Sequence, residues 1–215
     1  MSNEIIEKLT ESFRHFPGIG PRQAKRFVYH LLHAPASLTN QLLKQIEELK
    51  QSVTQCAQCF RFYSGKPKNG QDLICNICSD STRDASTLML VEKDIDLDNV
   101  LKSDTFSGYF FVLGGLVKIL DKTPETSIRA RELLLNLENR IKNRTENNKK
   151  LLEIIVALSA NQEGDTTLEF LKTYLAPILE KNKIKLSTLG RGLSTGVELE
   201  YSDADTLKNA LRNRQ

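Results

Sequence analysis

Four cysteines form the clearest chemical pattern in this 215-residue chain, and they are its only cysteines. They occur as two pairs, Cys56 with Cys59 and Cys75 with Cys78, and fifteen residues separate the pairs. Two Cys-x-x-Cys pairs at this separation are typical of a tetrahedral zinc site made of four thiolates. The spacing therefore predicts one zinc ion per chain. Because the protein fills all four ligand positions, the predicted role of the ion is structural rather than catalytic.

Two disulfide bonds are the alternative chemistry for the same four residues. Disulfides need an oxidising compartment, and residues 1–6 lack the basic start and apolar block of a secretory signal. No apolar run approaches the length of a membrane span. We therefore expect a cytoplasmic protein without membrane association, whose cysteines are reduced.

The segment before the cysteines is predicted to form three helices, because apolar residues recur with helical spacing over residues 4–14, from Pro21 onward, and over residues 37–52. A short Pro-Gly-Ile-Gly-Pro turn, residues 17–21, joins the first two helices. Proline suits the first position of a helix, and glycine lets the backbone approach a partner closely. The face of the second helix predicted to be buried consists of Ala24, Phe27, Val28, Leu31 and Leu32.

This order of helix, glycine turn and helix resembles the helix-hairpin-helix DNA-binding motif. Residues 12–46 contain no Asp or Glu, and clustered positive charge is the electrostatic footprint of nucleic-acid binding. The start of the second helix offers free N–H groups to a phosphate. The resemblance implies that the DNA backbone is contacted by Gly18, Gly20, Arg22, Lys25 and Arg26. A plain helical hairpin with a tight turn is the alternative interpretation.

Beyond the cysteines the pattern alternates between strand and helix. Strands are predicted at residues 87–91, 109–113, 153–158 and 185–189. Helices are predicted at residues 94–101 with Ile95 and Val100 inward, at 124–149 and at 167–181. Residues 202–205 resemble a capping box that opens a last helix through Leu207 and Leu211. Strands separated by helices predict a parallel sheet that is covered on both faces.

Three acidic residues follow predicted strands, and the carboxyl edge of a parallel sheet is where sites usually form. Glu92 closes the first strand, while Glu163 and Asp165 lie in a predicted loop after the third. Such carboxylates could hold Mg²⁺, and the arrangement resembles the Toprim domain of topoisomerases, primases and some nucleases. A set of solvated loop acids is the plainer alternative. We favour a vestigial Toprim site without catalysis, because fold analogy is a weak warrant for chemistry.

Six motifs in one register resemble the RecR family of bacterial recombination mediators over nearly the whole chain. They are the 17–21 turn, the four cysteines, Leu113-Gly114-Gly115, Glu163-Gly164-Asp165, Arg191-Gly192-Leu193 and residues 198–201. The resemblance implies a non-enzymatic, nucleoid-associated DNA repair protein that binds single- and double-stranded DNA without sequence preference. It also implies a homo-oligomer, commonly a tetramer, that acts with RecO and RecF to load RecA on single-stranded DNA. The three acids would then lie near partner-binding surfaces.

The predicted fold is α+β and multidomain. Residues 1–54 form the helix-hairpin-helix region, 55–80 the four-cysteine zinc finger, 81–182 the Toprim-like α/β domain, and 183–215 a C-terminal strand, loop and helix. Two other functions stay open at this point. One is a Mg²⁺-dependent nuclease or topoisomerase-like enzyme acting through the three acids, and the other is a protein-interaction scaffold in which zinc only stabilises an assembly surface.

Overall fold

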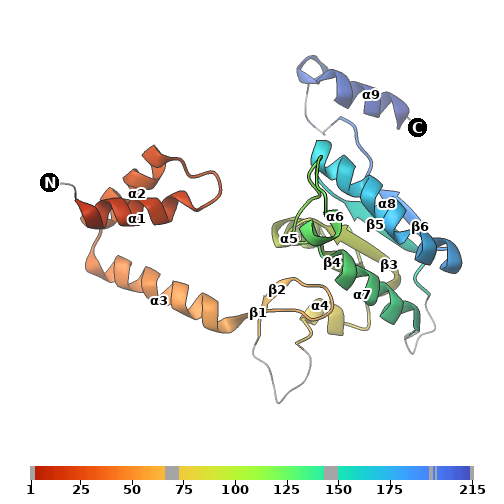
Figure 1. Cartoon of the computed structure of the whole chain (residues 1–215), viewed down its shortest axis with the longest axis horizontal. Helices are drawn as coiled ribbons and strands as arrows, with labels where there is room; N and C mark the ends of the chain where they lie inside the picture. Colours follow the sequence, from red (N-terminus) through yellow and green to blue (C-terminus); the bar gives the residue numbers. More distant parts are fainter. Residues whose placement is uncertain (1–2, 66–72, 143–149, 194–195, 197, 214–215) are drawn as a thin grey trace. The chain divides into compact units, whose positions relative to one another are not determined.

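The computed structural model describes residues 3–65, 73–142, 150–193, 196 and 198–213 (Figure 1). The chain divides into two compact units, residues 1–53 and residues 54–215, which we call unit 1 and unit 2. The cysteines therefore belong to the same compact unit as the strands that follow them. The finer predicted division of residues 55–215 into three domains stays a prediction.

In its described residues, unit 1 consists of α1 (Glu4–Arg14), α2 (Pro21–His33) and α3 (Ala36–Ser52). These helices confirm the predicted positions to within a residue. Phe13 of α1 and Phe27 of α2 meet edge to face, with ring centroids 5.7 Å apart. The predicted buried face of α2 is partly wrong, because Ala24 and Val28 are buried whereas Leu32 is 62% exposed. Since α1 is the main packing partner of α2, it covers only a narrow stripe of that helix.

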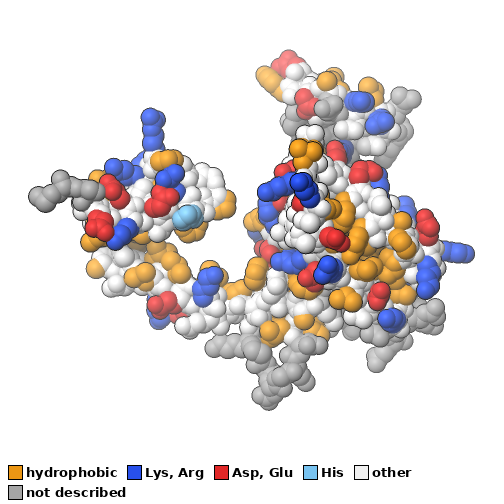
Figure 2. Space-filling model, viewed as in Figure 1, with side chains coloured by type: hydrophobic (Ala, Val, Ile, Leu, Met, Phe, Trp, Pro, Cys, Tyr) orange, Lys and Arg blue, Asp and Glu red, His pale blue; other side chains and the backbone are white. Residues whose placement is uncertain are grey.

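Helix α3 buries none of its residues. Figure 2 shows hydrophobic side chains on the visible face of this helix. Its exposed apolar side chains are Leu38, Leu42, Leu43, Ile46 and Leu49. Within the described residues of unit 1, the apolar face of α3 is therefore uncovered.

Unit 2 contains a four-stranded sheet with the strand order β4-β3-β5-β6. The strands are β3 (Asp84–Val91), β4 (Gly108–Val112), β5 (Glu153–Ala157) and β6 (Lys185–Thr188). All three pairings are parallel; the central strand β3 aligns Leu90 with Phe111 of β4 and with Val156 of β5. Both the predicted strands and their parallel arrangement are confirmed.

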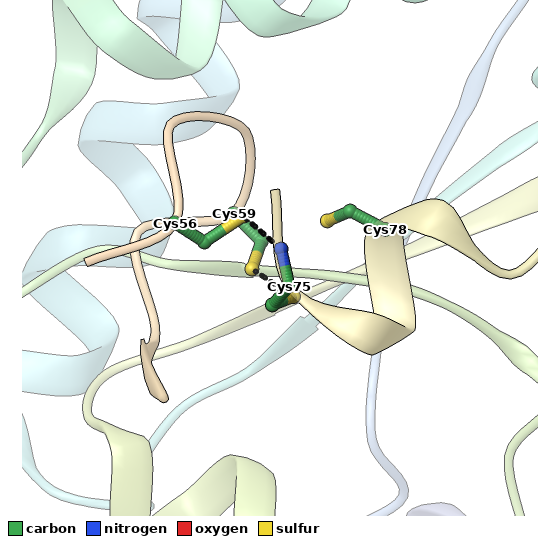
Figure 3. A group of neighbouring side chains, drawn as sticks. All are labelled: Cys56, Cys59, Cys75 and Cys78. Atoms are coloured by element: carbon green, nitrogen blue, oxygen red, sulfur yellow. Dashed lines mark hydrogen bonds between the residues drawn. The ribbon is translucent and has the colours of Figure 1, made fainter. Parts of the chain in front are cut away.

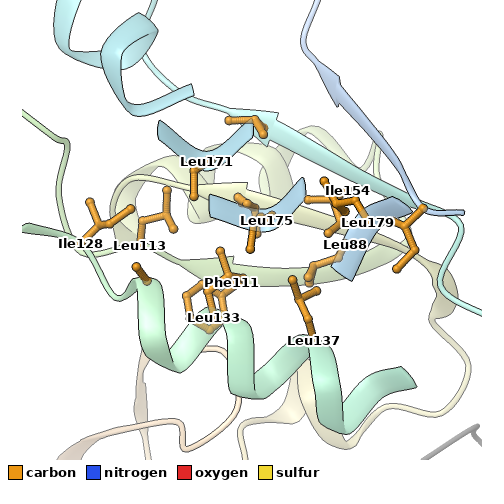
Figure 4. Packing of buried hydrophobic residues seen from close by; sticks show 14 of the residues in the cluster. Leu88, Phe111, Leu113, Ile128, Leu133, Leu137, Ile154, Leu171, Leu175 and Leu179 are labelled. Carbon is orange, nitrogen blue, oxygen red and sulfur yellow. The ribbon is translucent and has the colours of Figure 1, made fainter. Parts of the chain in front are cut away.

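Strands β3 and β4 bury side chains on both faces of the sheet, because successive side chains along a strand point to opposite faces. Leu88 and Leu90 of β3 point toward α7 (Ala130–Lys142) and α8 (Gln162–Asn182), and Figure 4 shows side chains of both helices meeting Phe111 and Ile154 in this layer. Met89 and Val91 point to the opposite face. There they join Leu97 of α5 (Asp94–Ser103) and three of the cysteines in a second core cluster.

The prediction of one continuous helix over residues 124–149 is wrong, because the helix is interrupted. The chain forms α6 (Pro124–Ser127) and then α7, because Ile128 between them is extended and buried in the core. The next residue, Arg129, donates its backbone N–H to the Leu113 carbonyl at 2.9 Å, and its side chain donates to the Val112 carbonyl. These two bonds tie the break to the end of β4. The rest of the predicted helix, residues 143–149, lies outside the described residues.

Two further predictions need correction. Helix α8 begins at Gln162 rather than 167, because the Asn161 side chain accepts a hydrogen bond from the Gly164 N–H at 2.8 Å and caps the helix. Glu163 and Asp165 therefore lie in the first helical turn and not in a loop. In α5, the prediction that Ile95 points inward is wrong, because its side chain is 61% exposed. Leu97 points toward the sheet instead and is buried.

The remaining elements are short. The hairpin strands β1 (Val53–Gln55) and β2 (Phe62–Ser64) precede α4 (Asn76–Ser79), and a 3-10 turn, η1 (Leu199–Tyr201), precedes the last helix, α9 (Ala204–Arg212). Asp203 caps α9 by accepting a hydrogen bond from the Thr206 N–H. Within the described part of the chain, no helix combines the length and the apolar character needed to cross a bilayer.

Candidate functional site

The four cysteine side chains converge on one point (Figure 3). Their sulfur atoms all lie within 4.8 Å of one another, and the Sγ atoms of Cys59 and Cys75 are 3.5 Å apart. Four sulfurs at the corners of a tetrahedron around zinc are about 3.8 Å apart, given a Zn–S bond of about 2.3 Å. All four are free thiols and three are fully buried. This arrangement could hold a metal ion, and a donor set of sulfur alone suits a soft cation.

Local backbone structure aims the sulfurs inward. The first pair lies in the turn between β1 and β2, where Phe60 adopts a left-handed conformation with φ of 62° and lets the chain reverse directly after Cys59. Its N–H donates to the Cys56 carbonyl at 3.0 Å. The second pair opens α4, with Cys75 at the N-cap position and Cys78 one turn later. The two pairs are also joined directly, because the Cys75 N–H lies 3.4 Å from the Cys56 sulfur.

The four thiols change one another's pKa values because they lie so close together. Hydrogen bonds from neighbouring cysteines raise the pKa of Cys59 and of Cys78, and burial raises each pKa further because it disfavours the thiolate. Four thiolates cannot share this volume without a compensating positive charge. A divalent cation would supply that charge, so the chemistry of the donor set fits a metal ion.

The first cysteine turn, which holds Cys56 and Cys59 between β1 and β2, is hydrogen-bonded to the edge of the sheet. The Cys59 carbonyl accepts a hydrogen bond from the Val112 N–H of the edge strand β4 at 2.9 Å. One residue earlier, the Gln58 carbonyl accepts one from the Asn136 side chain of α7 at 2.8 Å. The turn thus covers part of an edge strand that would otherwise present unpaired N–H groups. Metal binding at this point would stabilise the sheet as well as the cysteine loops.

The glycine turn of unit 1 leaves its backbone open. Gly18 has a positive φ of 76°, a conformation that favours glycine, while Gly20 has ordinary angles and forms the N-cap of α2. A Cβ atom added at either glycine would meet nothing within 4 Å. The fold itself therefore does not require a glycine at position 20. The open space on this side of the turn is where a partner could approach the backbone.

The basic side chains predicted to bind DNA lie on α2 and point away from its buried stripe. Among the described residues, none of Arg22, Lys25 and Arg26 forms an ion pair. The first turn of α2 contains no acid, and no side chain caps its N-terminus. Positive charge and the positive end of the helix dipole therefore coincide next to the open turn, which is an arrangement suited to an anion.

The acidic residues form a weaker constellation. Glu92 at the end of β3 is 8% exposed, and its carboxylate pairs with the Lys93 ammonium at 2.5 Å. The hydrogen bond to Glu92 raises the pKa of the Lys93 ammonium. Asp165 pairs with Arg191 at 2.5 Å, which raises the pKa of that guanidinium. Within the described ranges, the only group of three or more metal-ligating side chains close enough to share an ion is the cysteine cluster.

The cationic partners of these acids were not predicted from the sequence. Lys93 directly follows Glu92, and this adjacency is a visible signal for their pairing. Arg191 lies 26 residues from Asp165, and no local pattern connects the two. Gly164 is required for a different reason: a Cβ atom there would collide with the Ser159 carbonyl oxygen, so the start of α8 packs directly on the preceding turn.

The fold and these sites define a class: a helix-hairpin-helix unit followed by a four-cysteine centre on a Toprim sheet. Family models match the RecR helix-hairpin-helix at residues 6–50, the Toprim domain at 86–190 and the RecR C-terminal region at 192–215. The chain belongs to the RecR family, which has a role in recombination repair.

Curated relatives agree over the full length. A protein of Bifidobacterium animalis subsp. lactis is 34% identical over 210 residues, covering 98% of this chain and 95% of the relative. One of Desulforapulum autotrophicum is 35% identical over 212 residues, covering 99% and 96%. A third, of Synechococcus sp., is 34% identical over 215 residues, covering 100% and 99%. Each bears the name "Recombination protein RecR".

Proposed function

We propose that this protein is a non-enzymatic recombination mediator that binds DNA through the α1–α2 hairpin and helps to load RecA on single-stranded DNA. RecO and RecF are its proposed partners, and a homo-tetramer in the cytoplasm, associated with the nucleoid, is the proposed working form. The observation that carries the proposal is the open glycine turn beside three cations on α2 that form no ion pair among the described residues. Family membership supports the setting in recombination.

The proposed ligand of the hairpin is the phosphate backbone. Gly18 and Gly20 would let a phosphate reach the N–H groups at the start of α2, and Arg22, Lys25 and Arg26 would neutralise phosphates on either side. Phosphate contacts position a protein on DNA and carry no base information. Binding should therefore be independent of sequence, tolerate both single- and double-stranded DNA, and weaken steeply with salt.

The Toprim acids are proposed to act in partner docking or to be vestigial, rather than to hold Mg²⁺ for catalysis. Lys93 and Arg191 already place a positive charge beside Glu92 and Asp165. A divalent ion at this edge would have to compete with both. Glu163 is exposed in the first turn of α8, where a partner could reach it.

The metal is proposed to be one structural zinc ion per chain, held by Cys56, Cys59, Cys75 and Cys78. Purified protein should contain about one zinc per chain, by the four-ligand arithmetic of such sites. Metal analysis that finds none, together with four cysteines paired as disulfides, would refute this assignment.

Fluorescence anisotropy with labelled DNA over a series of salt concentrations tests the central proposal. The double variant Arg22→Ala with Arg26→Ala should bind weakly, and the slope of log affinity against log salt should fall by about 2 for duplex DNA. Lys44→Gln with Lys50→Gln is the matched control, since it removes two exposed charges of unit 1 from α3. Equal loss in both double variants would contradict the hairpin assignment.

A gel assay of supercoiled and single-stranded DNA with Mg²⁺ or Mn²⁺ tests the absence of catalysis. If the parent protein cleaves DNA and Glu92→Gln does not, the protein is a Toprim enzyme rather than a non-enzymatic mediator. Absence of DNA binding at every salt concentration would favour a scaffold that acts through protein contacts alone.

A further inference from the structure

Beside the cysteine cluster, a cavity of about 500 Å³ is lined by residues of the first cysteine turn and of α7. Its lining includes Cys78, which is the only partly exposed member of the four, together with Tyr109 of β4 and Arg140 of α7. Arg140 is partly buried, and it forms no ion pair with a carboxylate among the described residues. A partly buried guanidinium without a carboxylate partner is unusual, because burial of an unpaired charge is costly.

The surroundings of Arg140 explain why the charge is tolerated. Its guanidinium carbon lies 4.6 Å from the centre of the Tyr109 ring, and its Nε donates to the Asn136 side-chain oxygen at 2.8 Å. Burial lowers the pKa of Arg140, because it disfavours the charged form. Arg140 and Cys78 line the same cavity, so the cation lies next to the cysteine cluster.

A chain of hydrogen bonds also leads from Arg140 to the metal-binding turn. Arg140 donates a hydrogen bond to the side-chain oxygen of Asn136. The side-chain nitrogen of Asn136 in turn donates to the Gln58 carbonyl at 2.8 Å. Gln58 lies between Cys56 and Cys59. The Tyr109 hydroxyl donates to the Asp80 carbonyl at 2.8 Å, two residues after Cys78. The arginine and its two contacts therefore reach the backbone next to both cysteine pairs.

We propose that Arg140 is a positioning residue of the metal centre: its charge offsets the excess negative charge of four thiolates, and its hydrogen bond fixes the amide that holds the first cysteine turn. Four thiolates carry more negative charge than one divalent cation neutralises, and outer partners of this kind typically change metal affinity by about 10–100-fold. The inference rests on the proposed metal site. It adds a role for α7 that the four ligands alone do not suggest.

Zinc affinity of the full-length protein, measured by competition with a chelator at neutral pH, tests this role. Arg140→Gln should weaken zinc binding about 10–100-fold. Arg140→Lys keeps the charge but loses the planar fork, so it should recover part of the affinity. Arg131→Gln is the matched control, because Arg131 is an exposed arginine on the same helix and lines a different cavity. It should bind zinc like the parent.

The outcomes separate this role from mere packing. The positioning role of Arg140 would be wrong if Arg140→Gln bound zinc like the parent. It would also be wrong if Arg140→Lys or Arg131→Gln lost as much zinc affinity as Arg140→Gln. None of these results would contradict the metal site itself. A parent protein that binds no metal would overturn the metal site and Arg140's role together. Should Arg140→Gln fail to fold, Asn136→Ala breaks the same hydrogen-bond chain, and it must also weaken zinc binding if the chain matters.

Discussion

The two units use their apolar residues in opposite ways. Unit 2 buries whole side chains such as Leu88, Phe111 and Leu171 around a sheet whose strands β3 and β4 are buried on both faces. Among the described residues of unit 1, the buried apolar residues are Ala24 and Val28, whereas α3 exposes its leucines. A unit of about fifty residues has little surface to bury in any case. The contrast indicates that unit 2 provides the stable scaffold and unit 1 provides surface for contacts.

Polar interactions follow the same division. The described ion pairs of unit 1, such as Lys8 with Glu4, join residues three or four positions apart on one helix. Unit 2 also contains local pairs such as Lys172 with Glu169, but Lys185 pairs with Glu153 of the neighbouring strand, and Arg191 pairs with Asp165. The latter two pairs connect separate elements, but both are partly exposed, so each should contribute less than about 1 kcal/mol. This difference can be tested by changes placed in one unit at a time.

Loss of a cysteine should have the largest effect. Cys75→Ser should abolish metal binding and reduce the free energy of unfolding of unit 2 by about 4 kcal/mol or more, since loss of a structural metal is among the most damaging changes. Hydrogen exchange should show lost protection in β3 and β4 but unchanged protection in α1 and α2. Ser79→Ala, at an exposed position of α4, is the control. Equal loss of protection in both units would contradict the division.

Truncation of a core leucine should come next. Leu175→Ala removes a fully buried side chain of α8 and should cost about 3 kcal/mol through lost burial and a cavity. Leu43→Ala, at a position of α3 that is 57% exposed, should change stability by less than about 0.5 kcal/mol. Urea denaturation of both variants measures the difference. A large cost at Leu43 would mean that the face of α3 is covered in solution.

The glycines of the hairpin should separate stability from binding. Gly18→Ala forces a side chain into the left-handed region and should cost about 1 kcal/mol. Gly20→Ala has no such strain, but alanine is a poorer N-cap residue than glycine, so it should cost about 0.5 kcal/mol while still reducing DNA affinity. Thermal unfolding and DNA anisotropy on the same samples make the comparison. If Gly20→Ala bound DNA like the parent, close approach of a phosphate at this residue would be wrong.

Much of this structure is readable from the sequence wherever the signal is local. The cysteine pairs predict the convergence of the four sulfurs, because two cysteines with two residues between them can turn onto one point. Apolar runs bounded by polar residues predict all four parallel strands. The break before α7 is not readable, because Arg129 is held by the Leu113 carbonyl, sixteen residues earlier. The start of α8 was readable in principle from Asn161, a good N-cap residue. Its glycine and acids resembled a loop instead.

The smallest expected effect depends on pH. The Ser187 hydroxyl donates to Glu153 at 2.6 Å and lowers the pKa of that carboxyl, with Lys185 adding to the effect. A lowered pKa means that the ionised form stabilises the fold above the ordinary Glu value of about 4.5, and that this contribution disappears as the pH falls through the folded-state pKa. Glu153→Gln should therefore cost less than about 1 kcal/mol at pH 7, and the cost should shrink toward pH 3.

Urea denaturation of the parent and of Glu153→Gln at several pH values checks this expectation. Adding Ser187→Ala should reduce the effect of Glu153→Gln, because the hydroxyl that favours the carboxylate is then absent. Glu4→Gln provides the matched change in unit 1, where the pair with Lys8 is exposed on both sides and should contribute little. A cost of Glu153→Gln that stays constant from pH 7 to pH 3 would show that the interaction is not with the charged carboxylate. Cross-strand electrostatics would then not distinguish unit 2 from unit 1, and the contrast would rest on apolar burial alone.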